Sequence, residues 1–368
     1  MQHLAQLVAS TMHLPGGKIV SVDLVDTYIQ SALQRLRIPG LTVAVLQNGV
    51  VIKHQAYGLA SLEFNVPMTV TTRYNIASLT KMFTGAAIMT LIEMGQLALT
   101  DQVGTILPHL PTSWHEITIY HLLTHTAGLP DLADSVAGTF IAETREEAFG
   151  LLAVRPFLSQ PGESWRYNQT GYVLLGMVIE TLTGLAFDTF LTQQFLHPLG
   201  MSATCFGDSR EIVAGRTSLY TCMEKCDNAL VPSSDHLWTF QYHCPAYAYP
   251  CAGLNSTVSD LVKWDAALSA GSILSPEHLA KMWAPVRLND GTLGGIVGTS
   301  FGYGCGWVVV DRPGHPWVGH EGGAATVYGR FLQDQLSIIV LTNCRGAEPI
   351  TLLEGVAAHY LAPVQTPD

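Results

Sequence analysis

Charged residues are scarce in this chain, and basic residues are the scarcest. Asp, Glu, Lys and Arg make up 13% of its 368 residues, and 18 Lys and Arg stand against 29 Asp and Glu, which gives a net charge of −11. The sequence contains no basic cluster, which argues against nucleic-acid binding because such proteins neutralise phosphates with Lys and Arg. The 48% of hydrophobic residues instead predicts a packed globular protein with a substantial core.

Long apolar runs are also missing from the sequence. No stretch approaches the length of a membrane-spanning helix, and runs such as 336–341 have the length of a buried strand. The first ten residues have neither a basic segment nor a continuous apolar core, so they do not resemble a secretory signal. We therefore expect a cytoplasmic protein without a membrane span, unless a leader has been removed.

Cysteines are few and irregularly spaced. Their odd number and the lack of a Cys-x-x-Cys pair favour free, mostly buried thiols and give no support to a zinc site. Four of them fall within residues 222–251, so a local disulfide there stays open. The seven are Cys205, Cys222, Cys226, Cys244, Cys251, Cys305 and Cys344.

The predicted elements place strands towards both ends of the chain and helices between them. Residues 21–37 have helical spacing, and Asn48-Gly49 predicts a hairpin because a tight primed turn needs residues that tolerate positive φ. The paired runs are 41–46 and 50–58. Further helices are expected over 78–94, 119–124, 171–184 and 348–360, and further strands over 304–310, 317–320, 325–332 and 336–341.

This order of elements is not a regular alternation of strands and helices. We therefore predict an α/β (α+β) fold, in which an antiparallel sheet is flanked by helices and a helical lobe is inserted. A chain of this length is expected to form two lobes or one large domain with an insertion. The predicted division assigns residues 1–82 and 250–368 to a discontinuous α/β domain and residues 83–249 to the helical lobe.

The most informative motif is Ser78-Leu79-Thr80-Lys81, at the start of an apolar helical run. Positions i and i+3 share one face of a helix, so Ser78 and Lys81 are expected to point into the same pocket. The helix N-terminus adds unpaired N–H groups and a partial positive charge, which favour the anion formed when a serine attacks a carbonyl. The alternative is a helix cap with a surface lysine, because so short a pattern often occurs by chance.

Two later segments carry candidate partners for this pair. Tyr167 precedes an apolar helix, and a nearby lysine ammonium would favour its phenolate, so that the two groups could share a proton. Residues 317–325 are predicted as a strand that ends in glycines, where an N–H could be a second oxyanion donor beside that of Ser78. The alternatives are a packing tyrosine and a bulged strand edge with an incidental histidine.

Together, these segments resemble the serine β-lactamase and penicillin-binding-protein superfamily, in particular its class C β-lactamase and esterase branch. That family carries Ser-x-x-Lys, then Tyr-x-Asn, then Lys-Thr-Gly or His-x-Gly. The corresponding residues here are 78–81, 167–169 and 320–322, in the same order. Residues 120–130, 252–261 and 303–307 are also similar to the family, and the resemblance extends over about residues 22–345.

The resemblance implies a β-lactamase-like fold and a role for each site residue. Ser78 would be the acylated nucleophile, and Lys81 and Tyr167 would activate it and pass its proton to the leaving group. The N–H groups of Ser78 and Gly323 would form the oxyanion hole. No cofactor and no metal would be required. The substrate would be contacted by Gln169, His320, Gly322 and Gly323.

Two positions depart from the family pattern. Gln169 occupies the asparagine position and keeps an amide that can bond the substrate or Lys81, with a longer reach. His320-Glu321-Gly322 replaces Lys-Thr-Gly, so a cation that would hold a β-lactam or peptide carboxylate is lost and a carboxylate stands nearby. Both changes favour esterase, amidase or acyl-transfer chemistry on a substrate without that carboxylate.

Three other features of the sequence suggest a different nucleophile, a metal site and a wall of the substrate pocket. Residues 298–302 match the nucleophile elbow of α/β-hydrolases, but a strand pattern rather than a helix follows them. His121 and His125 have a metal-capable spacing, but no carboxylate completes the set, so a structural pair is favoured. An aromatic segment either packs beneath a long loop or forms part of the wall of an acyl pocket that favours apolar substrates. Its members are Tyr220, Trp238, Phe240, Tyr242, Tyr247 and Tyr249.

We therefore predict a serine hydrolase that forms an acyl-enzyme on Ser78, with carboxylic-ester hydrolysis as the leading activity. The alternatives are hydrolysis of amides, D-amino-acyl peptides or β-lactams on the same site, acyl transfer, and a catalytically silent protein that binds acyl compounds. The expected partner is a small ester or amide, and the sequence does not indicate an oligomeric state.

Overall fold

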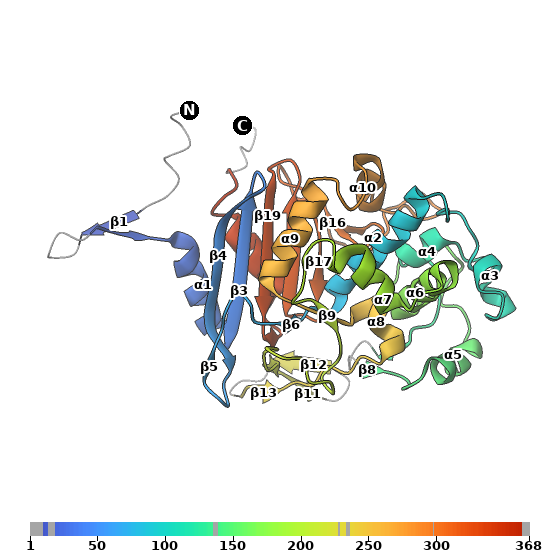
Figure 1. Ribbon diagram of the computed structural model, residues 1–368, viewed down its shortest axis with the longest axis horizontal. Coiled ribbons are helices and arrows are strands. Elements are labelled where there is room, and N and C mark those ends of the chain that lie inside the picture. The colour runs from blue at the N-terminus through green and yellow to red at the C-terminus, as the bar shows by residue number, and fades with distance from the viewer. Residues whose placement is uncertain are drawn as a thin grey trace.

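An antiparallel sheet of eight strands forms the centre of the computed structural model, which describes residues 10–13, 19–134, 139–226, 229–232, 236–296 and 298–362 (Figure 1). The strand order is β15-β16-β17-β18-β19-β3-β4-β5. Because β19 pairs with β3, segments from the two ends of the chain meet in the middle of the sheet, as the sequence predicted. The strands are β3 (Gly40–Gln47), β4 (Val50–Ser61), β5 (Val66–Pro67), β15 (Phe301–Tyr303), β16 (Val308–Val310), β17 (Trp317–Gly322), β18 (Thr326–Phe331) and β19 (Leu336–Thr342).

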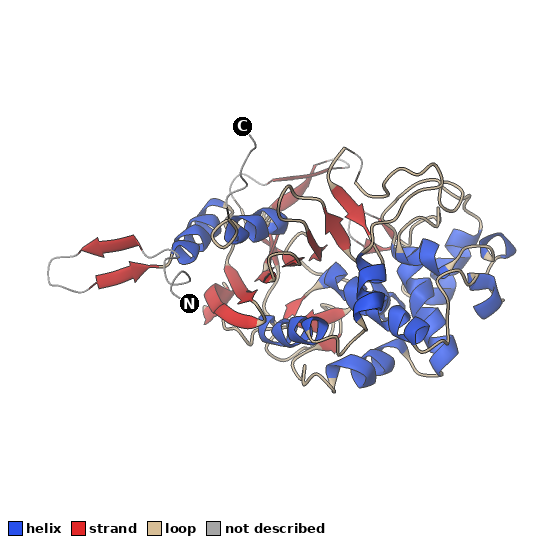
Figure 2. Cartoon of the chain, turned by 90° about the horizontal axis from the view of Figure 1, so that it is seen from above, coloured by secondary structure: helices blue, strands red, loops and turns tan. Residues whose placement is uncertain are grey.

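Helices cover both faces of this sheet (Figure 2). Helices α1 (Leu24–Arg35) and α11 (Pro349–Ala357) pack together on one face, and α9 (Val258–Ser269) packs on the other. Successive strand residues point to opposite faces, so Val43 contributes to the first core and Ala44 to the second. Since both faces are covered, β19 is buried along its whole length. The predicted class, an antiparallel sheet flanked by helices, is confirmed.

The other helices lie beside the sheet, around α2 (Thr80–Glu93) (Figure 1). The residues of α2 from Thr80 to Leu91 are all buried, as expected for a helix that is apolar on every side. One hydrophobic cluster joins the α9 face of the sheet to α2 and α6 (Gln169–Thr183). The remaining helices are α3 (Val103–Ile106), α4 (Ile119–Leu123), α5 (Arg145–Ala153), α7 (Phe187–Leu191), α8 (Tyr249–Ala252) and α10 (Pro276–Trp283).

No single helix in the described ranges is both long and apolar enough to cross a bilayer. Helix α6 and the segment Phe187–Leu196, which are bent by 76° to each other, reach the necessary length and composition only as a pair.

Short strands place segments from distant parts of the chain side by side. Strand β6 (Tyr74–Asn75), just before the 3₁₀ helix Ala77–Leu79, pairs with β14 (Leu254–Ser256). Strand β10 (Tyr220–Thr221) pairs with β20 (Cys344–Arg345). The middle of the chain thus contributes strands, which the sequence did not predict.

The remaining short strands of the described chain are β1 (Ser10–His13), β2 (Ile19–Val22), β7 (Ala133–Asp134), β8 (Thr139–Phe140), β9 (Cys205–Phe206), β11 (Met223–Cys226), β12 (Ala229–Pro232) and β13 (Trp238–Thr239).

One predicted turn is confirmed and one predicted strand is wrong. Asn48 and Gly49 have φ of 53° and 75°, as a primed hairpin turn requires. The strand expected over 304–310 is instead a hairpin of β15 and β16. The chain reverses there because Gly306 has φ of 86° and Gly304 donates its N–H to the Trp307 carbonyl.

Helix boundaries follow capping residues rather than the apolar pattern alone. Helix α1 begins at Leu24 because the Asp23 carboxylate accepts from the N–H groups of the first turn, so it is shorter than the predicted 21–37. Helix α6 begins two residues before the predicted 171 because Asn168 caps it. It ends where Gly184 adopts φ of 70°.

Cysteine side chains are described at six positions, and all six are free thiols. Five of them are buried, as the sequence predicted, and Cys205 is partly exposed. The side chain of Cys226 lies outside the described residues, but the other three cysteines of the segment 222–251 are free, so the local disulfide that the sequence left open is not formed.

Asn343 is a buried amide that joins the two ends of the chain just after β19. It has no exposed surface. Its Oδ1 accepts from the N–H of Gly40 at 2.8 Å, and its Nδ2 donates to the Leu59 carbonyl and to Thr217 Oγ1, both at 3.0 Å. One side chain therefore satisfies polar groups at the start of β3, near the end of β4 and in the middle of the chain.

We predict that Asn343→Ala lowers the free energy of unfolding by about 2–4 kcal/mol, because three buried groups lose their partner. Urea unfolding followed by circular dichroism measures this loss. The matched control is Gln47→Ala, which removes a single bond to the Asp334 carbonyl at a partly buried position and is expected to lower it by less than about 1 kcal/mol. Equal losses in the two variants would contradict the role given to Asn343.

Candidate active site

Ser78 lies at the start of the buried helix that carries Lys81. It is the middle residue of the 3₁₀ helix Ala77–Leu79, and Lys81 lies in the first turn of α2. Lys81 Nζ is 3.4 Å from Ser78 Oγ, so the two side chains share one face as predicted. Ala77 has φ of 44°, a strained conformation for a residue with a Cβ, and its N–H donates to Asn75 Oδ1 at 3.1 Å. Strain of this kind is typical of functional sites.

Lys81 is fully buried, and its amine is held by neutral groups. Besides Ser78 Oγ, Nζ contacts Gln169 Oε1 at 2.7 Å and the Cys251 carbonyl at 3.0 Å. No carboxylate lies within ion-pair distance of it in the described part of the chain. Gln169 uses its longer side chain to reach Lys81, which the sequence left open as one of two roles. The amine is therefore fixed beside the nucleophile by three segments of the chain.

Tyr167 approaches Lys81 from the loop before α6. The centre of its ring is 4.8 Å from Lys81 Nζ. The next residue, Asn168, fixes the loop by accepting from the Gly171 N–H at 3.0 Å and donating to the Leu129 carbonyl at 2.9 Å. The Tyr167 hydroxyl is buried and has no hydrogen-bond partner among the described residues. Within the described residues, the hydroxyl is therefore not bonded to the protein as that of a packing tyrosine usually is.

Gly322 and Gly323 bring the end of β17 against the residues before Ser78. A Cβ at Gly322 would lie 2.1 Å from the Ile76 carbonyl oxygen, which is too close for any other residue. A Cβ at Gly323, where φ is 58°, would lie 3.3 Å from that of Ala77. Residue 323 therefore lies against Ala77 and lines the same cavity as Ser78, where the sequence predicts two oxyanion donors.

His320 lies behind Tyr167 and does not line the cavity at Ser78. Its Nδ1 donates to the Glu321 carbonyl at 2.6 Å, and its Nε2 accepts from the Tyr303 hydroxyl at 2.9 Å. Burial, and to a lesser extent the Lys81 ammonium, lowers the pKa of His320 to about 3, so the ring is neutral at pH 7. The position expected for it beside the substrate is therefore not the one observed, because both of its nitrogens are bonded within the protein.

A cavity of about 230 Å³ opens at Ser78. Ser78, Tyr167, Gln169, Gly322 and Gly323 line it, and Lys81 is buried next to it. The structure thus brings together every predicted site residue except His320, which is set back by one layer of side chains. A small cavity with a hydroxyl, an amine, a phenol and backbone N–H groups is suited to attack on a carbonyl.

The predicted aromatic segment lies only in part at the cavity. Phe240 and Tyr242 line the cavity, together with Phe140, which the sequence analysis did not identify. Trp238 is 51% exposed. The Tyr220 hydroxyl instead bonds the Glu63 carboxylate. Only part of this segment therefore forms the apolar wall of the site.

Two supporting residues were not identified from the sequence as part of the site. His125 Nδ1 accepts from the Asn168 N–H at 3.2 Å, and its ring centre is 4.5 Å from that of Tyr167. Burial lowers the pKa of His125 well below its usual range, so it is a neutral support for the Tyr167 loop. Asp131 accepts from the Gln169 N–H at 2.9 Å. Each of the two forms its hydrogen bond with a residue about 40 positions further along the chain, so no local sequence pattern predicts its role.

His121 and the segment 298–302 lie apart from this cavity. His121 helps to cap α4, because its Nδ1 accepts from the Thr118 N–H, so it has a structural role. Residues 298–302 lead into β15 and not into a helix, as expected. Over the described ranges, no group of three or more His, Cys, Asp or Glu side chains is arranged to hold a metal ion.

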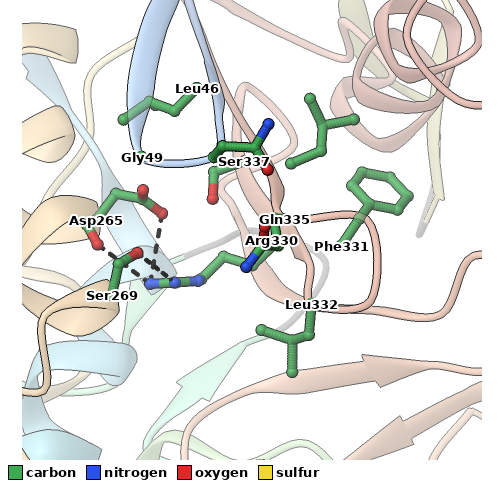
Figure 3. Close-up of a pocket in the computed structure, with 11 residues that line it drawn as sticks. Leu46, Gly49, Asp265, Ser269, Arg330, Phe331, Leu332, Gln335 and Ser337 are labelled. Atoms are coloured by element: carbon green, nitrogen blue, oxygen red, sulfur yellow. Dashed lines mark hydrogen bonds and ion pairs between the residues drawn. The ribbon is translucent and has the colours of Figure 1, made fainter. Parts of the chain in front are cut away.

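A second hollow, of about 350 Å³, lies between the β3–β4 turn, the β18–β19 turn and α9 (Figure 3). Arg330 crosses it, with Nη1 3.4 Å from Asp265 Oδ1 and Nη2 donating to Ser269 Oγ at 2.7 Å. The charge of this arginine is met by an acid of the same protein, and the hollow contains none of the predicted site residues. It is therefore not the candidate active site.

Comparison with known proteins shows relatives along almost the whole chain. A family model described as Beta-lactamase matches residues 25–360. Penicillin-binding protein 4* of Bacillus subtilis (strain 168) is 30% identical over 321 residues, which make up 82% of this chain and 67% of that protein. Protein flp of Staphylococcus aureus (strain MW2) is 34% identical over 187 residues, 50% of this chain and 38% of that protein. The chain thus spans two thirds or less of the length of these curated relatives.

Solved structures share the fold. The octameric penicillin-binding protein homologue from Pyrococcus abyssi has a TM-score of 0.75 and 27% identity, covering 92% of this chain and 77% of that one. EstCE1, described as a hydrolase with promiscuous acyltransferase activity, has a TM-score of 0.76 and 24% identity, covering 92% and 97% of the two chains. At this identity, the second likeness concerns the fold alone.

We predict that the folded state loses stability as the pH falls below 6.5, in part through His320. The unfolded chain binds a proton there near pH 6.5, whereas the folded protein resists it down to about pH 3, so unfolding takes up a proton within this window. The contribution of His320 to the free energy of unfolding is fully present above pH 6.5. It decreases towards pH 3, with a slope of up to about 1.4 kcal/mol per pH unit.

Urea unfolding of the wild type and of His320→Gln between pH 4 and 8 measures this slope. Glutamine can replace both hydrogen bonds of the ring but does not titrate, so the variant is expected to show a shallower decrease. A variant whose stability falls as steeply as that of the wild type would contradict a neutral buried imidazole.

Proposed function

The chain belongs to the β-lactamase family, whose fold and serine hydrolase chemistry it shares with the penicillin-binding proteins, and from this premise we propose that it hydrolyses carboxylic esters through an acyl-enzyme on Ser78. The observation that carries the proposal is the convergence of three groups at one cavity. Lys81 Nζ lies 3.4 Å from Ser78 Oγ and 4.8 Å from the centre of the Tyr167 ring. These groups come from two segments 86 or more residues apart, and Ser78 and Tyr167 line one cavity.

In the first step, Ser78 Oγ attacks the ester carbonyl, and the Lys81–Tyr167 pair takes the hydroxyl proton. The carbonyl oxygen becomes an oxyanion, which the N–H groups of residues 78 and 323 stabilise at the N-terminal end of the 3₁₀ helix. The intermediate collapses as the bond to the alcohol oxygen breaks. The pair returns its proton to that oxygen, so a neutral alcohol leaves and Ser78 remains acylated.

In the second step, water attacks the acyl carbon and loses a proton to the same pair. A second oxyanion forms at the same two N–H groups and collapses as the bond to Ser78 Oγ breaks. Ser78 regains its proton and a carboxylic acid leaves. Because Gln169 holds the Lys81 amine at 2.7 Å, the base keeps its position through both steps.

The apolar wall of the cavity supports an ester substrate. Phe140, Phe240 and Tyr242 line a space of about 230 Å³, which suits an apolar acyl or alcohol group. Amide hydrolysis is the second candidate, because the curated relative at 30% identity is a penicillin-binding protein. The same intermediate could be transferred to an alcohol or an amine. A catalytically silent binding protein would retain the cavity but fail to acylate.

We predict that a fluorescent alkyl phosphonate labels the wild type and that Ser78→Ala is not labelled, because only the serine oxygen can displace its leaving group. With 4-nitrophenyl acetate, Lys81→Ala and Tyr167→Phe are each expected to lose about 10²–10⁴-fold in kcat. The double variant should lose little more than either single one, since the two groups act as a unit.

Circular dichroism serves as the control that each variant is folded. A folded wild type that resists labelling would indicate the binding protein instead. Losses in the double variant that equal the product of the single losses would contradict proton sharing between the amine and the phenol.

We also predict that Phe240→Ala and Tyr242→Ala reduce the preference for longer acyl chains. Each removes part of the apolar wall, so the ratio of kcat/KM for 4-nitrophenyl hexanoate over acetate is expected to fall about 5–30-fold, equivalent to losing about 1–2 kcal/mol of apolar contact. Trp238→Ala is the matched control, since this exposed side chain does not line the cavity. An unchanged ratio in both wall variants would remove this role from the segment.

A further inference from the structure

Asp131 is fixed against the start of α6 by the loop that precedes β7. Its Oδ1 accepts from the Gln169 N–H at 2.9 Å. Its two neighbours both bond Thr170: the Pro130 carbonyl accepts from Thr170 Oγ1 at 2.7 Å, and the Leu132 N–H donates to the same oxygen at 3.0 Å. Thr170 has no exposed surface, so this contact belongs to the core. The carboxylate therefore has a fixed position beside the first turn of the helix.

Gln169 connects this carboxylate to the amine of the active site. Its backbone N–H binds Asp131, and its side-chain Oε1 accepts from Lys81 Nζ at 2.7 Å. Asp131 and Lys81 are thus linked through one residue, and none of the ion pairs in the described ranges joins them directly. Asp131 does not line the cavity at Ser78, so it is placed to act on the amine and not on the substrate.

Electrostatic attraction between Asp131 and Lys81 extends across the intervening residue. Burial raises the pKa of Asp131, while the backbone N–H groups that it accepts from and the Lys81 ammonium oppose this rise. The attraction between two charges is mutual, so the carboxylate favours the protonated form of the amine. Water screens this attraction little, because Lys81 has no exposed surface.

The other titratable groups around Lys81 and Tyr167 are neutral at pH 7. The histidines are neutral because burial lowers their pKa, and the thiols and phenols keep their protons because burial raises the pKa of each. None of them can balance the charge of the ammonium. These groups are His125, His320, Tyr172, Tyr303, Cys244 and Cys251.

Two charged residues nearby do not balance the amine either. Arg345 lines the cavity from β20, and a second cation disfavours an ammonium. Glu321 follows His320 on β17, and successive strand residues point to opposite faces, so its carboxyl points away from the face that carries His320. Over the residues that the structure describes, Asp131 therefore remains as the carboxylate placed to balance the charge of Lys81.

We propose that the negative charge of Asp131 sets the proton affinity of the Lys81–Tyr167 pair. Asp131 is then a positioning residue that acts through Gln169, and the inference rests on the proposed acyl-enzyme chemistry at Ser78. A buried amine without a nearby anion gives up its proton readily and is a weak base. The carboxylate opposes this effect, so the pair can take the proton of the Ser78 hydroxyl and return it to the leaving group.

The test is the pH dependence of ester hydrolysis in Asp131→Asn. The amide oxygen of asparagine can still accept from the Gln169 N–H, so the variant removes the charge and keeps the contact. For 4-nitrophenyl acetate between pH 5 and 9, the acidic limb of kcat/KM is expected to move to lower pH by about 0.5–1.5 units, because the protonated pair loses its counter-charge. The plateau should fall about 3–30-fold, because a weaker base takes the Ser78 proton less readily.

Two further variants separate charge from structure. Asp131→Glu restores the charge, so its acidic limb should return towards that of the wild type even if its rates are lower. Glu163→Gln is the matched control, because this exposed carboxylate accepts from the Gln160 N–H at 2.9 Å and lies on the loop before Tyr167. Its limb should stay within about 0.2 units of the wild type. Lower rates in Asp131→Asn at every pH, with an unmoved limb, would show a purely structural role and overturn the proposal.

A measurement on the free protein distinguishes this inference from the proposed function. The sequence contains six lysines, so labelling of lysine with ¹³C at Cε gives few NMR signals, and that of Lys81 is the one missing in Lys81→Ala. Its titration midpoint should move to lower pH by about 0.5–1.5 units in Asp131→Asn. Such a shift would support the role of Asp131 even if no ester is hydrolysed. An unmoved midpoint, with ester hydrolysis intact, would overturn that role and leave the acyl-enzyme proposal standing.

Discussion

The burial of Lys81 is the constraint on which the rest of the site depends. An amine without exposed surface must find acceptors within the protein, and it finds them on Ser78, Gln169 and Cys251. These residues belong to three separate segments, so satisfying one buried group obliges the start of α2, the start of α6 and α8 to converge. The site is therefore assembled by the same requirement that stabilises the core around it.

The sheet packs against the start of this helical cluster from the other side. Gly322 lets the end of β17 approach the Ile76 carbonyl more closely than any side chain would permit. The 3₁₀ helix that bears Ser78 is thus held between a strand and a buried amine, and the strain at Ala77 is maintained by both. A flexible loop could not hold a hydroxyl, a phenol and backbone N–H donors at fixed distances from one another, whereas two packed layers can.

Much of this arrangement could be predicted from the sequence, because its signals are local. The spacing of Ser78 and Lys81, the Asn48-Gly49 turn and the apolar runs of β3 and β19 each depend on neighbours in the chain. The roles of His125 and Asp131 could not be predicted, because each acts through a partner that only folding brings near. His320 shows the same limit, since the hydroxyl of Tyr303 decides its position and charge.

The pairing of β19 with β3 has a consequence for how this protein folds during translation. Gly40 and Asn343 are hydrogen-bonded although 303 residues separate them. Strand β3 therefore cannot pair with β19 until residues 336–342 have been translated, and the β3–β4 hairpin must remain unpaired on one edge until then. Synthesis speed and chaperone protection of that edge are expected to govern yield more strongly than the stability of the finished molecule.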